Sequence, residues 1–303
     1  MSWTDTALNL LGLPENWGYR PLDPLATEPL ALAALALMGH GRLAEAEAAC
    51  RKLLDLQNSD GSLGLNASET SPPWPTGWSL LAWQAFGALS SQAGLSPFQS
   101  AIEKAISWVL SFEGKPLPLT DEIGHNTTLI GWPWVASTHS WYEPTCLFVH
   151  ALRGAGKGSD PRSREGVKLL IDRLLPTGGA NYGNVAVLGQ TLMPHLDSSG
   201  LALLVLAREK DVDGRIKKTV DYVQRAVSAE ATGASLACGL MGLSAHNVFL
   251  PDSEKRIAQA AERTQKRGAY LPRLSLLLLA ALGTECPLLI PLRQPTGRVE
   301  EQN

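Results

Sequence analysis

Six segments of this chain are apolar almost throughout, and this feature most restricts what the chain can fold into. One of them follows Trp141-Tyr142-Glu143-Pro144-Thr145 and continues as Cys-Leu-Phe-Val-His-Ala-Leu. A proline suits the first helical turn because its missing N–H would be unpaired there, and an acid beside it favours the positive end of the helix dipole. Helices that are apolar on every side must be buried on every side. The predicted inner helices cover residues 28–39, 76–89, 143–152, 199–207, 232–243 and 272–282.

Helices with a single apolar stripe alternate with these buried segments. In residues 161–175 the stripe consists of Val167, Leu170, Ile171 and Leu174, which follow the 3.6-residue helical period. The other amphipathic segments are 42–57, 96–112, 213–227 and 252–266. Strand signals are nearly absent. We therefore predict an all-α, single-domain α/α toroid of about six inner and six outer helices, although an open solenoid would satisfy the same pattern.

The domain organisation follows from this alternation. Residues 1–25 form an N-terminal helix and a Pro-rich arm, residues 26–282 form the toroid, and residues 283–303 form a Pro-rich tail. No amphipathic segment follows the last inner helix. We expect the short N-terminal helix, residues 4–11, to occupy that position and close the ring.

Composition excludes several classes of function. The formal net charge is -3 and no Lys/Arg block stands out, so nucleic acid is not an expected partner. The N-terminus lacks the basic flank and apolar stretch of a signal peptide, and no apolar run reaches the roughly 20 residues of a membrane span. The four cysteines are widely spaced, which favours buried free thiols and a cytoplasmic protein. No His-Glu-x-x-His or phosphate-binding glycine loop occurs, so we expect no metal and no cofactor.

Two loops resemble the repeat of a known family. Residues 57–63, Gln-Asn-Ser-Asp-Gly-Ser-Leu, are similar to the Gln-x-x-x-Gly-x-Trp repeat of squalene and hopene cyclases, with Leu63 in place of Trp. Residues 175–183 resemble a more decayed copy. The Pro-Thr helix openings at 75–76 and 144–145 are also typical of this superfamily, which includes the β subunits of protein prenyltransferases. The resemblance implies an α/α toroid that holds an isoprenoid or similar apolar chain in its central cavity.

A third motif resembles the acidic motif of the class II terpene cyclases. His195-Leu196-Asp197-Ser198-Ser199-Gly200 falls where that family has Asp-x-Asp-Asp-Thr-Ala. The resemblance implies that Asp197 is the proton donor, with His195 and Ser198 in place of the flanking acids. The chain departs from both branches of the superfamily. The cyclases resemble two toroid-like domains that enclose a dry cavity, whereas this chain has length for one. The zinc ligands of the prenyltransferases have no equivalent here.

Four acids hold the same position relative to the start of an inner helix: Glu28, Glu143, Asp197 and Glu230. If the inner helices run parallel, these acids approach one mouth of the ring, where they can act as general acid or base. The alternative is that each caps its helix and interacts with the helix dipole, which stabilises by roughly 0.5–2 kcal/mol. The candidate catalytic residues are Asp197, Glu143 and His195.

Aromatic residues supply candidate ligand contacts. All nine tryptophans lie in residues 1–141, and aromatic faces stabilise a cation by roughly 0.5–2 kcal/mol each. The candidate substrate-binding residues are Trp74, Trp78, Trp132, Trp134, Trp141 and Tyr142. The alternative is ordinary packing, which we expect for Trp83 and Trp108. The loop at 113–139 is longer than an ordinary connection, and we expect it to fold over the acidic mouth, with Trp132 or Trp134 in contact there.

Three classes of function remain open from the sequence. The first is an enzyme acting on an isoprenoid, with Asp197 as acid. The second is a catalytically inactive toroid that binds a lipid or a partner. The third is a carbohydrate-active enzyme, since α/α toroids also host glycosidases and lyases, and fold alone does not separate these classes. The expected partner is an apolar small molecule, and a peripheral membrane contact, a partner subunit and a homodimer are left open.

Overall fold

The chain folds almost entirely into helices, as the sequence predicts. The computed structural model describes residues 2–90, 96–119, 123–227 and 231–293. Within these ranges there are thirteen α-helices and a single two-stranded antiparallel sheet, formed by β1 (Ala186–Val187) and β2 (Gln190–Thr191). The all-α class is therefore confirmed.

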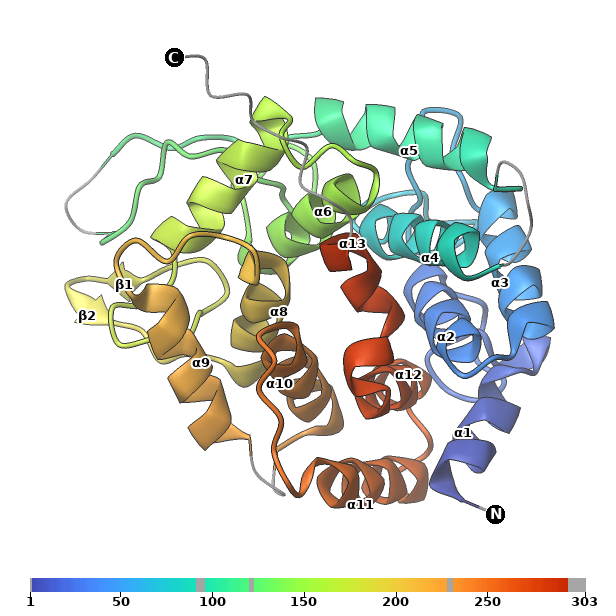
Figure 1. Cartoon of the computed structure of the whole chain (residues 1–303). Helices are drawn as coiled ribbons and strands as arrows, with labels where there is room; N and C mark the ends of the chain where they lie inside the picture. The colour runs from blue at the N-terminus through green and yellow to red at the C-terminus, as the bar shows by residue number, and fades with distance from the viewer. Residues whose placement is uncertain (1, 91–95, 120–122, 228–230, 294–303) are drawn as a thin grey trace.

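Six helices form the inner layer, and they match the six apolar segments. They are α2 (Thr27–Gly39), α4 (Thr76–Leu89), α6 (Tyr142–Gly154), α8 (Leu196–Leu206), α10 (Gly233–Ala245) and α12 (Leu271–Ala281). Each packs against the next in this order, and α12 packs back against α2 (Figure 1). The contacts between inner helices therefore run round a closed cycle.

Amphipathic helices cover this inner layer. They are α3 (Leu43–Asp55), α5 (Gln99–Ser111), α7 (Pro161–Asp172), α9 (Arg215–Ala226) and α11 (Ser253–Lys266), and each packs on the inner helix that precedes it. Their stripes explain the packing: in α9, Ile216, Val220 and Val223 are buried while Lys217 and Lys218 remain exposed. The N-terminal helix α1 (Trp3–Leu11) contacts α12, α2 and α11, so it occupies the position predicted for the sixth outer helix (Figure 1). A 3₁₀ turn, η1 (Pro14–Asn16), follows α1.

An equivalent hydrogen-bonded unit precedes three of the inner helices. In each, a backbone N–H donates to the hydroxyl oxygen of a Thr or Ser near the helix start, and that hydroxyl donates at 2.6 Å to a carbonyl three or four residues earlier. The N–H and hydroxyl pairs are Leu63 with Thr76 (2.8 Å), Trp132 with Thr145 (3.0 Å), and Ala180 with Ser199 (2.9 Å). The repeat inferred from sequence thus has a structural counterpart, and Trp132 belongs to it.

Two glycines allow the loops of this unit to lie against the next outer helix. Gly61 and Gly178 have φ of +97° and +95°, a region that side chains disfavour. A Cβ atom at Gly61 would clash with the backbone carbonyl of Lys104 in α5, and one at Gly178 with that of Lys218 in α9. The two loops that resemble the cyclase repeat therefore share one geometric requirement.

The C-terminal segment covers the end of the ring at which the inner helices finish. It consists of η2 (Gly283–Glu285), η3 (Pro287–Leu289) and α13 (Ile290–Arg293). The turn η3 packs on α2 and α4, and α13 packs on α6, so the segment crosses the middle of the ring in Figure 1. The described part of the predicted tail is thus short and packed. No helix among the described residues has the length and apolarity to cross a bilayer.

Candidate functional site

Three of the four predicted acids lie close together at the end of the ring where the inner helices begin. Glu28, Glu143 and Asp197 are each the second residue of their helices, α2, α6 and α8. The negative charges of Glu28 and Asp197 both act on the carboxyl group of Glu143. The first turns of these three helices therefore meet at the same end. Glu230 lies outside the described residues.

Glu143 is the acid whose protonation this arrangement changes most. Burial, followed by the charges of Glu28 and Asp197, raises the pKa of Glu143 to about 8. The side chain keeps some accessible surface, so crowding by protein atoms, rather than complete enclosure, separates it from bulk water. At pH 7 the carboxyl group therefore holds its proton. A carboxylic acid with a pKa near the working pH is what general acid catalysis requires.

Glu28 is held by a tyrosine from the N-terminal arm. The Tyr19 hydroxyl donates a hydrogen bond of 3.0 Å to Glu28 Oε2. Burial raises the pKa of Glu28, and this hydrogen bond opposes the increase. The ring of Tyr19 stacks on Tyr270, with centroids 5.8 Å apart, and the Arg273 guanidinium lies 5.5 Å from the Tyr270 centroid. Aromatic faces thus flank the acidic cluster.

Asp197 is the third acid of the cluster and the second residue of helix α8. Its Oδ1 accepts a 2.9 Å hydrogen bond from the Ser198 N–H, a contact typical of an acid at a helix start. Burial, and then the charge of Asp197, raises the pKa of Tyr222 in α9. The Tyr222 hydroxyl donates to the Pro194 carbonyl at 3.0 Å. Asp197 therefore lies in the first turn of α8, within the acidic cluster, and α8 has no side-chain cap at its start.

Tyr19, Tyr222 and Tyr270 were missed by the sequence analysis. Tyr19 lies in an arm without helical periodicity, and Tyr270 lies in the turn before α12. Neither position carries a local signal of contact with Glu28. The one available indication was that Tyr270 directly precedes an inner helix, as Trp141 does.

Two buried thiols, Cys146 and Cys238, lie close enough to the acids for the charge of Glu143 to act on both. Cys146 follows Glu143 by one helical turn, and burial, followed by the charge of Glu143 and an effect of Cys238, raises its pKa well above the usual value. Burial, then the charges of Asp197 and Glu143, also raises the pKa of Cys238. All four cysteines are free and buried, as predicted. Among the described residues no group of His, Cys, Asp or Glu is arranged to hold a metal ion.

His195 lies at the rim and faces an aromatic ring. It directly precedes α8, and its carbonyl accepts the Ser199 hydroxyl at 2.6 Å. Its imidazole stacks on Tyr182, with centroids 4.3 Å apart, and the Tyr182 side chain is half exposed. The catalytic role predicted for His195 remains a prediction.

Trp132 and Tyr142, which were predicted as ligand contacts, are core residues without exposed surface, and that role remains a prediction. Both are completely buried. Trp132 Nε1–H donates to the Val109 carbonyl at 2.9 Å, and the Tyr142 hydroxyl donates to the Leu170 carbonyl at 3.0 Å. Their polar atoms are satisfied within the fold. Both side chains fill space between α6 and the outer layer, which their position beside a loop did not reveal.

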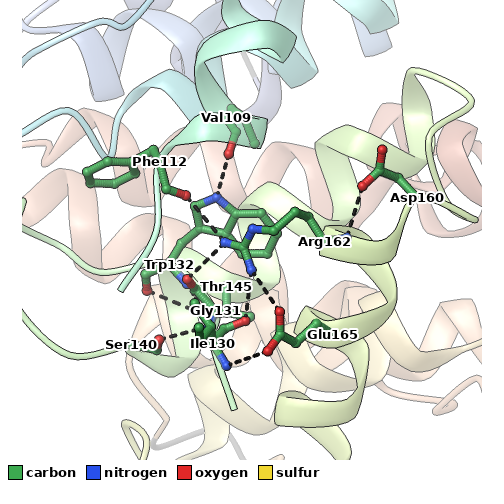
Figure 2. Close-up of polar contacts among 10 residues, drawn as sticks. All are labelled: Val109, Phe112, Ile130, Gly131, Trp132, Ser140, Thr145, Asp160, Arg162 and Glu165. Carbon is green, nitrogen blue, oxygen red and sulfur yellow. Dashed lines mark hydrogen bonds and ion pairs between the residues drawn. The ribbon is translucent and has the colours of Figure 1, made fainter. Parts of the chain in front are cut away.

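Two side chains from α7, Arg162 and Glu165, contact the segment 130–132 at the end of the long loop (Figure 2). The Arg162 guanidinium lies 4.4 Å from the centroid of the Trp132 ring. Its Nη1 donates to the Ile130 carbonyl at 3.0 Å, while Glu165 Oε1 accepts the Ile130 N–H at 3.1 Å. The end of the long loop is therefore anchored to α7.

The remaining predicted aromatics lie near the start of α4 and α6. Trp74 and Trp134 meet edge to face with centroids 5.0 Å apart, which brings the long loop to the N-terminal end of α4. Trp141 lies 4.7 Å from the His139 ring. Trp78 is buried, and its Nε1 has no hydrogen-bond partner in the described part of the chain. Trp74, Trp134 and Trp141 keep accessible surface and remain candidate ligand contacts.

Trp83 and Trp108, which were expected to be packing residues, pack within the fold. Trp83 is buried and donates from Nε1 to the Cys50 carbonyl at 3.0 Å, and Trp108 stacks on Phe112 with centroids 4.4 Å apart. These predictions of ordinary packing are confirmed.

Comparison with known proteins identifies the fold and no family. No protein-family model matches the chain, and no curated protein matches it significantly in sequence. The crystal structure of a protein from Actinoplanes matches with a TM-score of 0.56 and 14% identity, over 93% of this chain and 99% of that one.

A second solved structure is native α2-macroglobulin from Escherichia coli, in the part from domain MG7 to the C-terminus. It matches with a TM-score of 0.51 and 13% identity, over 93% of this chain and 42% of that one. The chain thus spans less than half of that fragment. Likeness at such low identity concerns the fold alone, and neither structure is described as a cyclase or prenyltransferase. The resemblance to that superfamily remains a hypothesis.

Proposed function

We propose that this chain is an enzyme that uses Glu143 as a general acid at the end of the ring where the inner helices begin. The observation that carries the proposal is the pKa of Glu143, raised to about 8 by burial and by the charges of Glu28 and Asp197. A proton donor must hold its proton at the working pH, and Glu143 does so at pH 7. In this proposal the donor role expected for Asp197 passes to Glu143, and Asp197 becomes its charged neighbour.

The surroundings of Glu143 suit a reaction in which positive charge develops on the substrate. Protonation of a leaving oxygen or of a double bond creates such charge. The carboxyl groups of Asp197 and Glu28 then stabilise it electrostatically, in a site where protein atoms replace much of the water. The stacked rings of Tyr19 and Tyr270 offer aromatic faces beside Glu28.

Solvent access favours a hydroxylated, glycoside-like substrate. Glu28, Glu143 and Asp197 all retain accessible surface. The neighbouring Tyr19, Tyr222 and Tyr270 do so too. A carbocation formed from an isoprenoid would be quenched by water, whereas glycoside cleavage uses water as the second reactant. Most glycosidases also catalyse with a pair of carboxyl groups, and the acidic cluster of this chain supplies such groups beside aromatic side chains.

An isoprenoid substrate is the second candidate. The observation that favours it is the apolar interior directly behind the acids, where Cys146 and Cys238 are buried within helices α6 and α10. An apolar chain bound there would place a double bond or a terminal group near Glu143. This alternative requires the bound chain itself to exclude water from the acidic cluster.

Substrate panels with matched variants test the proposal. The wild type, Glu143→Gln and a control, Glu103→Gln on the exposed face of α5, are incubated with aryl glycosides and with polyprenyl substrates, and products are detected by mass spectrometry. We expect turnover of a glycoside by wild type and control, and a loss of about 10²–10⁴-fold in kcat for Glu143→Gln. Turnover of polyprenyl substrates alone would favour the second candidate. No product from any substrate, or an undiminished rate in Glu143→Gln, would refute the enzyme proposal.

A further inference from the structure

A basic cavity lies between the long loop and the C-terminal end of α7, separate from the acidic cluster. Its volume is about 180 Å³. Its polar lining includes Lys115, His125, Thr127, His139, Arg173 and Asn184. None of these side chains belongs to the candidate catalytic cluster, and none of the described residues that line the cavity carries a carboxylate. The space is large enough for a small ion, and the ionisable groups among the described lining residues are Lys115, Arg173 and two histidines.

Arg173 is the central observation. The residue is only 5% exposed, and its Nη1 donates to the Ser140 carbonyl at 2.8 Å. Its Nε is buried and has no hydrogen-bond partner, and the guanidinium forms no ion pair with any described residue. Burial lowers the pKa of Arg173 to about 10, so the group stays charged at neutral pH. A buried charge without an ion pair is costly, which points to an anion as its partner.

One described acid, Asp172, acts on the charge of Arg173, and it partly opposes the effect of burial on the pKa of Arg173. The Oδ2 atom of Asp172 accepts the Asn126 N–H at 2.8 Å, and Asp172 forms no ion pair with Arg173 within the described part of the chain. On the same side, Arg215 donates to the backbone carbonyls of Asp172 and Leu174. From the loop side come Lys115 and the two histidines. The local charge is therefore positive.

Of the two histidines, His139 can add a donor, whereas His125 already forms a hydrogen bond with the backbone of Ile123. Burial, and then the charge of Arg173, lowers the pKa of both His125 and His139, so both rings are neutral at pH 7. A neutral imidazole still donates one N–H. His125 Nδ1 is buried without a partner in the described part of the chain. Two residues that line the cavity, Arg173 and His125, thus each have a buried nitrogen without a partner in the described part of the chain.

We propose that this cavity binds a small oxyanion, a phosphate or carboxylate group, with the Arg173 guanidinium as its principal ligand. Arginine suits this role because its planar donors match two oxygens of one anion. Lys115 supplies a second positive charge, and His139 donates from the loop, where His125 also lines the cavity. The inference does not depend on catalysis at Glu143.

Binding of inorganic phosphate and of malonate to the full chain tests the proposal. Isothermal titration and thermal shift at pH 7.5, with ionic strength held constant by NaCl, measure each anion. We expect saturable binding of at least one of them by the wild type. Lys115→Met should weaken it about 3-fold or more, and Arg173→Lys about 10-fold or more, because lysine cannot donate in a planar pair.

Controls keep the test decisive. Lys168→Met removes an exposed positive charge from the same helix, α7, without touching the cavity, and should leave the affinity unchanged. If Arg173→Lys fails to fold, Lys115→Met and His125→Gln replace it, because neither side chain is part of the core. The preferred anion identifies the ligand class. Absence of saturable binding by the wild type, or equal affinities in the wild type and the cavity variants, would overturn the proposal.

Discussion

At the scale of single residues, the structure distinguishes three acids that hold the same position at a helix start. Glu28, Glu143 and Asp197 hold the same sequence position, and the capping interpretation applied equally to all of them. The structure distinguishes Glu143, because two other carboxyl groups and a crowded environment surround it. Sequence identified the position of each acid. It did not reveal the difference between them, because that difference depends on contacts between α2, α6 and α8.

The stability of the protein should depend on pH through Glu143. Its pKa in the folded state, about 8, lies above the ordinary value of 4.5. Between these values the folded state holds a proton that the unfolded state has lost, so stability decreases as pH rises through this window. Glu143→Gln cannot ionise. It should be more stable than wild type by up to about 5 kcal/mol at pH 9, since one pKa unit corresponds to about 1.4 kcal/mol, and nearly equal at pH 4.5.

Urea denaturation at pH 4.5, 7 and 9 measures this difference. The matched control is Glu103→Gln, at an exposed position of α5, which should follow the wild type at every pH. A constant difference between Glu143→Gln and wild type across the three pH values would show that Glu143 ionises normally.

Tyr19→Phe tests the contact that places the N-terminal arm beside Glu28. Loss of the 3.0 Å hydrogen bond should destabilise the fold by about 0.5–1.5 kcal/mol. It should also raise the pKa of Glu28, because this hydrogen bond opposes the effect of burial. Carboxyl carbon chemical shifts followed against pH report that pKa. An unchanged midpoint for Glu28 would mean that the Tyr19 hydroxyl does not hold it in solution.

At the scale of elements, local periodicity predicted the helices well and the loops poorly. All inner and outer helices appear where the apolar patterns put them, because each pattern lies within one segment of chain. The burial of Trp132 was not predictable in the same way. Its loop lacks the Gln-x-x-x-Gly spacing, and only the hydrogen bond from its N–H to Thr145 reveals it as a third copy of the repeated unit.

Gly61→Ala tests the close approach of one repeat loop to α5. The variant combines a disfavoured φ of +97° with a clash against the Lys104 carbonyl. We expect a total destabilisation of more than about 2 kcal/mol. Positive φ alone costs an alanine about 1 kcal/mol, and the clash adds the rest. Gly41→Ala is the control, since Gly41 has φ of +76° and open space around it. Equal effects of the two substitutions on unfolding free energy would exclude the clash.

At the scale of the whole molecule, the two ends of the ring differ. One end gathers carboxyl groups and tyrosines at the helix starts, and the other is covered by the C-terminal segment. Sequence predicted that segment as a Pro-rich tail, because three prolines in 283–303 break any helical period. Its packing across the ring depends on contacts with helices more than a hundred residues away, such as the 2.6 Å contact between His150 Nε2 and the Leu288 carbonyl.

Leu288→Ala measures how strongly the C-terminal segment is held. Leu288 is 1% exposed, and its truncation should cost about 2–4 kcal/mol of unfolding free energy. Leu188→Ala, at a residue that is 82% exposed in the β1–β2 turn, is the control and should change stability by less than about 0.5 kcal/mol. Equal small effects would indicate that the segment is not packed on the ring in solution.

The central claim, that Glu143 holds a proton at neutral pH beside two other acids, is tested most directly by titrating its carboxyl group. Carbon-13 NMR of the glutamate side chains follows the Glu143 signal against pH, with Glu143→Gln assigning it. We predict a midpoint of about 8 in the wild type. In Asp197→Asn the midpoint should move downward, because one of the neighbouring charges is removed. A Glu143 midpoint near 4.5, unaffected by Asp197→Asn, would contradict the account.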